Sequence, residues 1–199
     1  MNLEQYIDQL KRSEGDNIRS IIEIPEKAPR YAELPPALGP ELTAALKGRG
    51  IDRLYSHQKE AFELYAAGKD FVVTTPTASG KTLCYLLPIL QAKLKNPNGK
   101  HLFMFPTKAL AQDQLASYRS YADALQKVWN VNTFDGDTPE EERRQVKKAG
   151  DFILTNPDML HSGIMPHHTI WKSFFENLET IVIDEMHTYI GVFGSHVAN

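Results

Sequence analysis

Thr75-Pro-Thr-Ala-Ser-Gly-Lys-Thr82 follows the apolar run Phe71-Val-Val-Thr74, which is typical of a buried strand. A Gly-Lys-Thr turn between a strand and a helix can hold the phosphates of a nucleotide on the backbone N–H groups of the helix N-terminus. Thr75 stands where the strict phosphate-loop pattern has its first glycine, but the last three residues keep their expected types. Lys81 can reach the β- and γ-phosphates, and Thr82 can offer its hydroxyl to Mg²⁺. We therefore assign nucleotide binding to Thr77, Ala78, Ser79, Gly80, Lys81 and Thr82.

A second apolar run, Ile181-Val-Ile183, ends in Asp184-Glu-Met-His187. An acidic pair that leaves a buried strand can hold Mg²⁺ and orient a water molecule. We expect Asp184 to hold the metal together with Thr82, and Glu185 to position and deprotonate the attacking water. A lone histidine here is more often a packing residue, and only the neighbouring carboxylates favour a linking role for His187. The two motifs predict hydrolysis of a nucleoside triphosphate, with catalytic residues Lys81, Asp184, Glu185 and His187.

Gln58 lies in the stretch Tyr55-Ser-His-Gln58, upstream of the phosphate loop. A glutamine amide can donate to and accept from an adenine edge at the same time, which would select ATP. Considered alone, a glutamine near a helix start is nearly always a surface residue, and only the nearby phosphate loop favours the functional interpretation. We therefore predict that Gln58 reads adenine and that the cofactors are ATP and Mg²⁺.

The composition sets the class of protein. The 199 residues are enough for one well-filled domain with a short extension. A net charge of −3 and a pI near 6.2 argue against a protein that binds nucleic acid by charge alone. Cys84 is the single cysteine, so no internal disulfide can form, and the N-terminus does not have the pattern of a signal peptide. No run of about 18 apolar residues is present, so we expect a cytoplasmic protein without a membrane partner.

Helical and extended segments alternate along most of the chain. Short apolar strands separated by helices predict an α/β fold, in which helices cover both faces of a parallel sheet. We expect a short, mainly helical N-terminal extension with a proline-rich strap at 1–50, and the nucleotide-binding domain at 51–199. Helices are expected at 2–14, 41–48, 57–67 (with Ser56 as N-cap), 81–94, 107–126, 138–149 and 168–177, and strands at 71–75, 101–105, 128–134, 152–155 and 180–183.

Three polar loops follow predicted strands and precede helices. Because ligands bind at the carboxyl edge of a parallel sheet, these loops should lie beside the nucleotide. Each loop alone is more typical of a capped helix start, but three in register favour a track for the backbone of a nucleic-acid strand. The predicted track comprises Pro106, Thr107, Lys108 and Gln112 in the first loop, Asp135, Gly136, Asp137 and Thr138 in the second, and Thr155, Asn156, Pro157 and Asp158 in the third. Two basic clusters, Lys93/Lys95/Lys100 and Arg143/Arg144/Lys147/Lys148, are interpreted as solvated helix faces.

With these motifs in place, residues 50–199 resemble the first RecA-like lobe of superfamily 2 DExH-box helicases. Gln58 matches the adenine-reading glutamine of that family, Thr77–Thr82 its phosphate loop, and Asp184–His187 its Asp-Glu-x-His box. The three loops match its successive nucleic-acid-contacting motifs. Pro76–Thr82 and the run His187–Ala198 look most like the bacterial MrfA (YprA) group, which is similar to eukaryotic RecQ-like DNA repair helicases. Ala78 departs from the glycine that many relatives carry.

The resemblance implies a RecA-like P-loop NTPase fold and a 3′→5′ DNA helicase or translocase used in DNA repair or genome maintenance. The implied partners are single-stranded or partly duplex DNA and a second RecA-like lobe of the same polypeptide. That lobe would carry an arginine finger, so we expect this chain to be truncated and to hydrolyse ATP poorly by itself, since a finger contributes about 10³–10⁵ in rate. Two alternatives stay open: an RNA helicase with the same lobe, because the motifs read phosphates, and a nucleotide-gated nucleic-acid-binding module.

Overall fold

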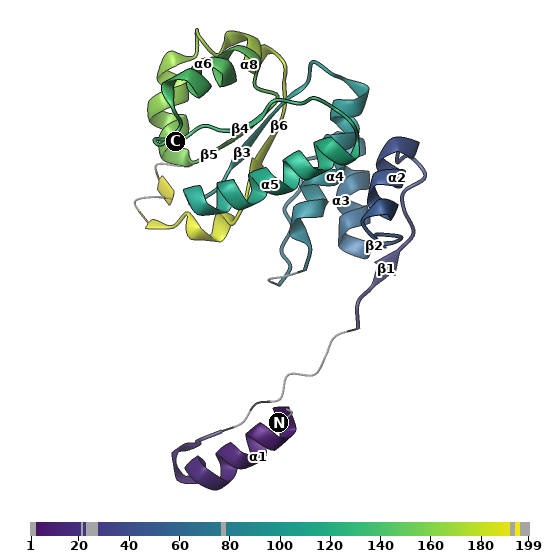
Figure 1. Cartoon of the computed structure of the whole chain (residues 1–199), viewed down its shortest axis with the longest axis vertical. Coiled ribbons are helices and arrows are strands. Elements are labelled where there is room, and N and C mark those ends of the chain that lie inside the picture. Colours follow the sequence, from purple (N-terminus) through teal and green to yellow (C-terminus); the bar gives the residue numbers. More distant parts are fainter. Residues whose placement is uncertain (1–2, 21, 23–27, 77–78, 192–193, 196–199) are drawn as a thin grey trace. The chain divides into compact units, whose positions relative to one another are not determined.

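A computed structural model describes residues 3–20, 22, 28–76, 79–191 and 194–195 (Figure 1). The chain divides into two units, Met1–Arg30 and Tyr31–Asn199. The first unit contains helix α1 (Leu3–Glu14), which confirms the helix expected at 2–14 and buries none of its residues. Among the described residues, no helix is both long and apolar enough to cross a lipid bilayer.

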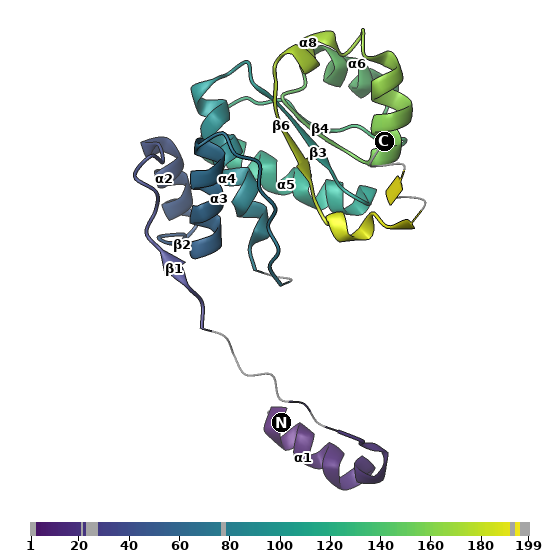
Figure 2. The ribbon, with the colours of Figure 1, turned by 180° about the vertical axis from the view of Figure 1, so that it is seen from behind.

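The second unit contains a parallel sheet in the order β4-β5-β3-β6 (Figures 1 and 2). The strands are β3 (Lys100–Met104), β4 (Val131–Thr133), β5 (Phe152–Thr155) and β6 (Leu178–Ile183). The connecting helices are α4 (Lys81–Lys95), α5 (Lys108–Ala124), α6 (Glu140–Ala149), the short α7 (Pro157–Met159) and α8 (Lys172–Glu176). The predicted α/β fold with a parallel sheet is confirmed, although β4 and α8 are shorter than the segments expected at 128–134 and 168–177.

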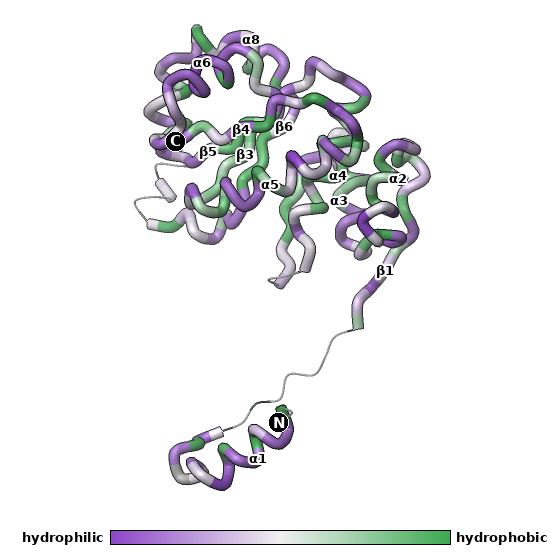
Figure 3. Tube along the Cα trace, in the orientation of Figure 1, coloured by the Kyte–Doolittle hydropathy of each residue, from purple (hydrophilic) through white to green (hydrophobic). Residues whose placement is uncertain are grey.

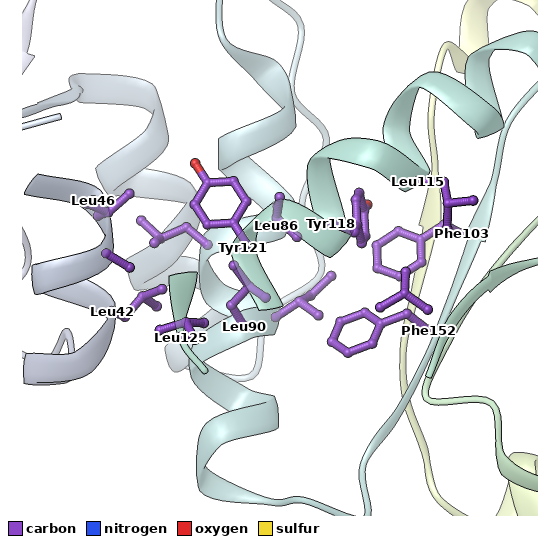
Figure 4. Packing of buried hydrophobic residues seen from close by; sticks show 14 of the residues in the cluster. Leu42, Leu46, Leu86, Leu90, Phe103, Leu115, Tyr118, Tyr121, Leu125 and Phe152 are labelled. Atoms are coloured by element: carbon purple, nitrogen blue, oxygen red, sulfur yellow. The ribbon is translucent and has the colours of Figure 1, made fainter. Parts of the chain in front are cut away.

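Helices cover both faces of this sheet. Successive side chains of a strand point to opposite faces, and alternate residues of β3 and β5 accordingly belong to two different cores. Phe103 and Phe152 join the first core, together with Leu86 and Tyr118 from the helices (Figure 4). Their neighbours along the two strands, Leu102 and Ile153, point to the other face and join a second core around α6 and α8. Figure 3 shows apolar residues concentrated in the strands and in α4, whereas α6 is largely hydrophilic, as expected for a helix with one solvated side.

The first core also includes the helices that precede the phosphate loop. Helix α2 (Pro40–Gly48) contributes Leu42 and Leu46, both completely buried. Strand β1 (Tyr31–Ala32) pairs antiparallel with β2 (Leu54–Tyr55), and α3 (Ser56–Ala66) follows directly. The expected helices at 41–48 and 57–67 are confirmed, but Ser56 as N-cap is wrong. The helix begins one residue earlier, because the side-chain oxygen of Gln58 reaches back to the N–H of Tyr55 at 2.9 Å.

The strand expected at 71–75 is also wrong, because these residues form no strand in the structure. Val72 is 71% exposed, and β6 is an edge strand that pairs with β3 alone. A cavity of about 1060 Å³ is lined both by Phe71–Pro76 and by Glu179–His187. Strand propensity mainly reflects packing against neighbouring strands, so an apolar run without a hydrogen-bonded partner does not become a strand.

A buried ion pair lies where β3 begins, and it corrects the interpretation of Lys93 and Lys100 as solvated. Lys93 is 1% exposed, and its ammonium donates to Asp151 Oδ1 at 2.6 Å and to two backbone carbonyls. Lys100 donates to the same carboxylate oxygen at 3.0 Å. Burial alone would raise the pKa of Asp151, but the hydrogen bonds from Lys93, the Asn130 N–H and Lys100 hold it below its ordinary value.

Asp151→Asn keeps the shape of the side chain and leaves the Lys93 ammonium buried without its counter-ion. We expect the free energy of unfolding, measured by urea denaturation at pH 7, to fall by about 3 kcal/mol. Because the pKa of Asp151 is lowered in the folded state, its carboxylate stabilises the fold at pH values above the unfolded-state pKa. This stabilisation is lost as the carboxylate is protonated, so the difference in free energy of unfolding between wild type and variant should shrink below about pH 4.

The matched control is Asp137→Asn, which breaks an ion pair between side chains that are 79% (Asp137) and 47% (Lys108) exposed. That variant should keep the wild-type denaturation midpoint, since exposed pairs contribute little. Equal losses in the two variants would contradict the role assigned to burial.

Candidate functional site

The phosphate loop leads into α4. Gly80 is the N-cap of this 15-residue helix, and its φ of +76° is a left-handed conformation that glycine adopts without strain. The Lys81 ammonium donates to the carbonyl of Thr75 at 3.1 Å, and the hydroxyls of Thr75 and Ser79 are 2.6 Å apart. Two predicted binding residues, Thr77 and Ala78, lie outside the described residues. The described part of the loop places Lys81 and the helix N-terminus where phosphates can bind.

Helix α3 supports the back of this loop. The amide nitrogen of Gln58 donates to the carbonyl of Gly80 at 2.9 Å, and Nε2 of His57 lies 3.0 Å from the carbonyl of Ser79. The other end of the Gln58 amide accepts from the Tyr55 N–H, and the residue is only 3% exposed. Gln58 therefore ties the start of α3 to the phosphate loop, and its reading of adenine stays a prediction.

The acidic pair lies at the carboxyl end of β6. The Asp184 N–H donates to the carbonyl of Met104 at 2.9 Å, which extends the ladder between β3 and β6 by one bond. Its carboxylate accepts the Glu185 N–H on Oδ1 at 2.9 Å and the Tyr85 hydroxyl on Oδ2 at 3.0 Å. Glu185 has a φ of +48°, an uncommon conformation for a residue with a side chain, and its Oε2 lies 3.3 Å from Nδ1 of His187. Such strained backbone at a polar turn is frequent in functional sites.

The two motifs meet around the cavity described above. Lys81, Asp184, Glu185 and His187 all line it, although the first is far from the others in sequence. The described residues contain no group of three or more His, Cys, Asp and Glu side chains arranged for a metal ion. Mg²⁺ is usually held by one or two protein oxygens together with the phosphates of a nucleotide. Thr82 and Asp184 are suitable oxygens, and both lie near the Tyr85 hydroxyl.

The three polar loops are linked to one another by side chains. The Lys108 ammonium is 2.6 Å from Asp137 Oδ2, and this bond raises the pKa of Lys108. Gln112 donates to the hydroxyl of Thr133 at 3.1 Å, just before the second loop. The Thr155 hydroxyl donates to the carbonyl of Phe134 at 2.7 Å, which joins the third loop to the second. The predicted track is therefore one continuous edge of the protein.

Not every predicted track residue faces solvent. Asp135, Thr138 and Thr155 are buried, and Asp135 Oδ1 accepts the N–H groups of Asp137 at 2.8 Å and Thr138 at 3.1 Å. Asn156 caps α7 by accepting the Met159 N–H at 2.9 Å. These side chains shape the loops. The exposed members of the predicted set are Thr107, Lys108, Gln112, Gly136, Asp137 and Asp158.

Two site residues were missed from the sequence. Arg143 was assigned to a solvated cluster, but its guanidinium donates to the carbonyls of Thr138 and Asp135 at 2.8 Å each and so fixes the second loop. Tyr85 lies outside both sequence motifs. It follows Lys81 by four residues, and residues at that spacing share one face of a helix. This spacing was the signal in the sequence that Tyr85 could lie near the nucleotide site.

Comparison with known proteins agrees with this geometry. A family model described as DEAD/DEAH box helicase matches residues 55–199. The chain is 49% identical over its whole length to the uncharacterised ATP-dependent helicase YprA of Bacillus subtilis, and 39% identical over 98% of its length to the ATP-dependent helicase HRQ1 of Saccharomyces cerevisiae. A crystal structure of the DUF1998 helicase MrfA bound to DNA and AMPPNP superposes on the whole chain with a TM-score of 0.94 and 48% identity.

The similarity covers a limited part of these relatives. The chain spans 26% of YprA, 18% of HRQ1 and 28% of the MrfA chain. A structure of the DEAD-box helicase Mss116 covers 81% of this chain with a TM-score of 0.66 and 20% identity, so it supports the fold alone.

Gly80→Ala tests whether the loop depends on close packing against α3. A Cβ on Gly80 would lie 2.6 Å from Nε2 of Gln58, whereas a Cβ on Gly50, which has a similar φ of +75° and does not line the cavity, would meet nothing within 4 Å. Both substitutions cost about 1 kcal/mol for the left-handed conformation. Only Gly80→Ala should also reduce the affinity for a fluorescent ATP analogue by more than about tenfold. Equal affinities for the two variants would contradict the assigned contact.

Proposed function

The chain belongs to the DEAD/DEAH box helicase family, and from this membership we propose that it is the first ATP-binding lobe of a helicase that moves along DNA. The observation that carries the proposal is the convergence of Lys81, Asp184 and Glu185 on one cavity, at the same sheet edge as three linked polar loops. A phosphate loop and an acidic pair provide the groups that bind ATP with Mg²⁺ and position the attacking water. The adjoining loops provide a surface that can bind the nucleic-acid strand along which the protein would move.

Each residue near the cavity has a separate role in this proposal. Lys81 and the N-terminus of α4 bind the phosphates, and Gln58 holds the loop while reading adenine. Thr82 and Asp184 hold Mg²⁺, which neutralises charge on the phosphates when it is bound. Glu185 orients a water molecule and takes its proton, and His187, within reach of Glu185 Oε2, links this base to the protein surface.

The loops hold one strand by its phosphates. Thr107 caps α5 by accepting the Leu110 N–H at 3.3 Å, and the first amides of this 17-residue helix form a site for a phosphate group. Lys108 adds the positive charge. The main support for DNA as the strand is that the similar MrfA is described bound to DNA. By the same likeness we propose 3′→5′ movement, a role in DNA repair and a cytoplasmic location.

A second RecA-like lobe completes the proposed motor. The chain spans 26% of YprA and 28% of the MrfA chain, so these relatives have room for a second lobe and further domains. The lobe would close on ATP and reopen after hydrolysis, so that the strand advances. RNA remains the alternative substrate, because the exposed groups of the loops contact phosphates that both nucleic acids carry.

ATPase turnover of the full-length protein tests this proposal, with single-stranded DNA, single-stranded RNA or neither. We expect stimulation by DNA, loss of turnover in Lys81→Ala, and a loss of about 10²–10⁴-fold in Glu185→Gln, because a positioned general base contributes that much. Glu185→Gln should retain bound ATP. Stronger stimulation of ATPase turnover by RNA than by DNA would identify an RNA helicase. Turnover that neither nucleic acid stimulates would favour a nucleotide-gated binding module.

The salt dependence of DNA binding tests the role of Lys108. Lys108→Ala should weaken binding and reduce the slope of log K against log salt by about one, because one phosphate contact is lost. Asp137→Asn should strengthen binding, since this carboxylate competes with phosphate for the Lys108 ammonium. Lys172→Ala, which removes an exposed lysine paired with Glu176 on α8, is the control and should keep the wild-type slope.

A further inference from the structure

Tyr85 connects the two halves of the nucleotide site, although neither sequence motif includes it. It lies on α4 one turn after Lys81, and its hydroxyl crosses to the end of β6, where it donates to Asp184 Oδ2 at 3.0 Å. The ring is half-buried and packs against Phe103 of β3, with ring centroids 6.3 Å apart. The ring therefore anchors the residue in the first core while its hydroxyl reaches the site.

The surroundings of this hydroxyl argue for a role beyond packing. Thr82, Asp184 and Tyr118 surround it, so it lies beside both oxygens assigned to Mg²⁺. Tyr118 provides a contrast in the same cluster. Its hydroxyl is buried and lies beside the Tyr85 hydroxyl, but it forms no hydrogen bond to Asp184. Of these two neighbouring phenols, Tyr85 is the one whose hydroxyl holds a carboxylate of the site.

We propose that Tyr85 is a positioning residue, which holds the Asp184 carboxylate in the orientation needed for the Mg²⁺ that accompanies ATP. The inference rests on the proposed function, since it takes Asp184 to be a metal-binding residue. Asp184 Oδ1 is already held by the Glu185 N–H, and the Tyr85 hydroxyl holds Oδ2, so both oxygens have one fixed partner. Each oxygen keeps a further lone pair with which to meet the metal or its water.

This arrangement fixes the distance between phosphate and carboxylate groups. Lys81, Thr82 and Tyr85 belong to one rigid helix, so the hydroxyl that orients Asp184 moves together with the residues that bind the phosphates. Groups that orient a metal ligand in this way commonly contribute about 10–100-fold to metal affinity.

Tyr85→Phe in the full-length protein is the test, because it removes the hydroxyl and keeps the ring. Binding of a fluorescent, non-hydrolysable ATP analogue is measured as Mg²⁺ is titrated, and again in EDTA. We expect the half-saturating Mg²⁺ concentration to rise about tenfold, while the affinity in EDTA and the melting temperature stay at the wild-type values. An unchanged Mg²⁺ requirement, or an equal loss of affinity in EDTA, would overturn the proposal.

Two further variants separate the possible causes. Tyr118→Phe removes the neighbouring hydroxyl, which does not bind Asp184, and should keep the wild-type Mg²⁺ requirement. Asp184→Asn should abolish the Mg²⁺ dependence, and adding Tyr85→Phe to it should have no further effect, because the two residues act through one contact. Wild-type binding without any Mg²⁺ dependence would refute the proposed function itself. The positioning role alone would be refuted by a different result. In that case the wild type shows a Mg²⁺ dependence, Asp184→Asn loses it, and Tyr85→Phe keeps the wild-type Mg²⁺ requirement.

Discussion

The position of β3 between two parallel neighbours determines where the functional loops lie. Met104, its last residue, is in register with Thr155 of β5 and with Ile183 of β6. The backbone bonds continue past the strands, from Phe105 to Thr155 and from Asp184 to Met104, each at 2.9 Å. Since parallel strands end at the same edge, one register places the acidic pair and two of the polar loops side by side.

Similar charged pairs act differently at the two ends of this strand. At its beginning, Lys93 and Asp151 form a buried pair that is surrounded by backbone carbonyls and the aromatic core. Beyond its end, Lys108 and Asp137 form an exposed pair that water and salt weaken. The two buried charges have a structural role and keep each other as partners, because either charge alone would be costly to bury away from water. The exposed lysine can exchange its partner for a phosphate group.

The functional edge is built from rigid loops with few free side chains. Asp135 and Thr138 bind the backbone of their own loop, Thr155 binds the loop beside it, and Arg143 braces the second loop from α6. What remains for a ligand is largely backbone N–H groups, the start of α5 and a single paired lysine. Such a surface suits recognition of a sugar-phosphate backbone without selection of base sequence. It also agrees with the modest net charge of −3.

The α/β class, most of the helices and strands, and the two motifs of the nucleotide site could be predicted from the sequence, because hydrophobic periodicity and turn chemistry are local properties. Which apolar run becomes a strand depends on tertiary contacts: β6 has a parallel partner, whereas the run at 71–75 has none among the described residues. The burial of Lys93 and the bond from Tyr85 to Asp184 were beyond local reasoning, because Asp151 and Asp184 are distant from these residues in sequence. The partners of Arg143 are only five and eight residues away, but the conformation of the second loop decides that its carbonyls reach the guanidinium.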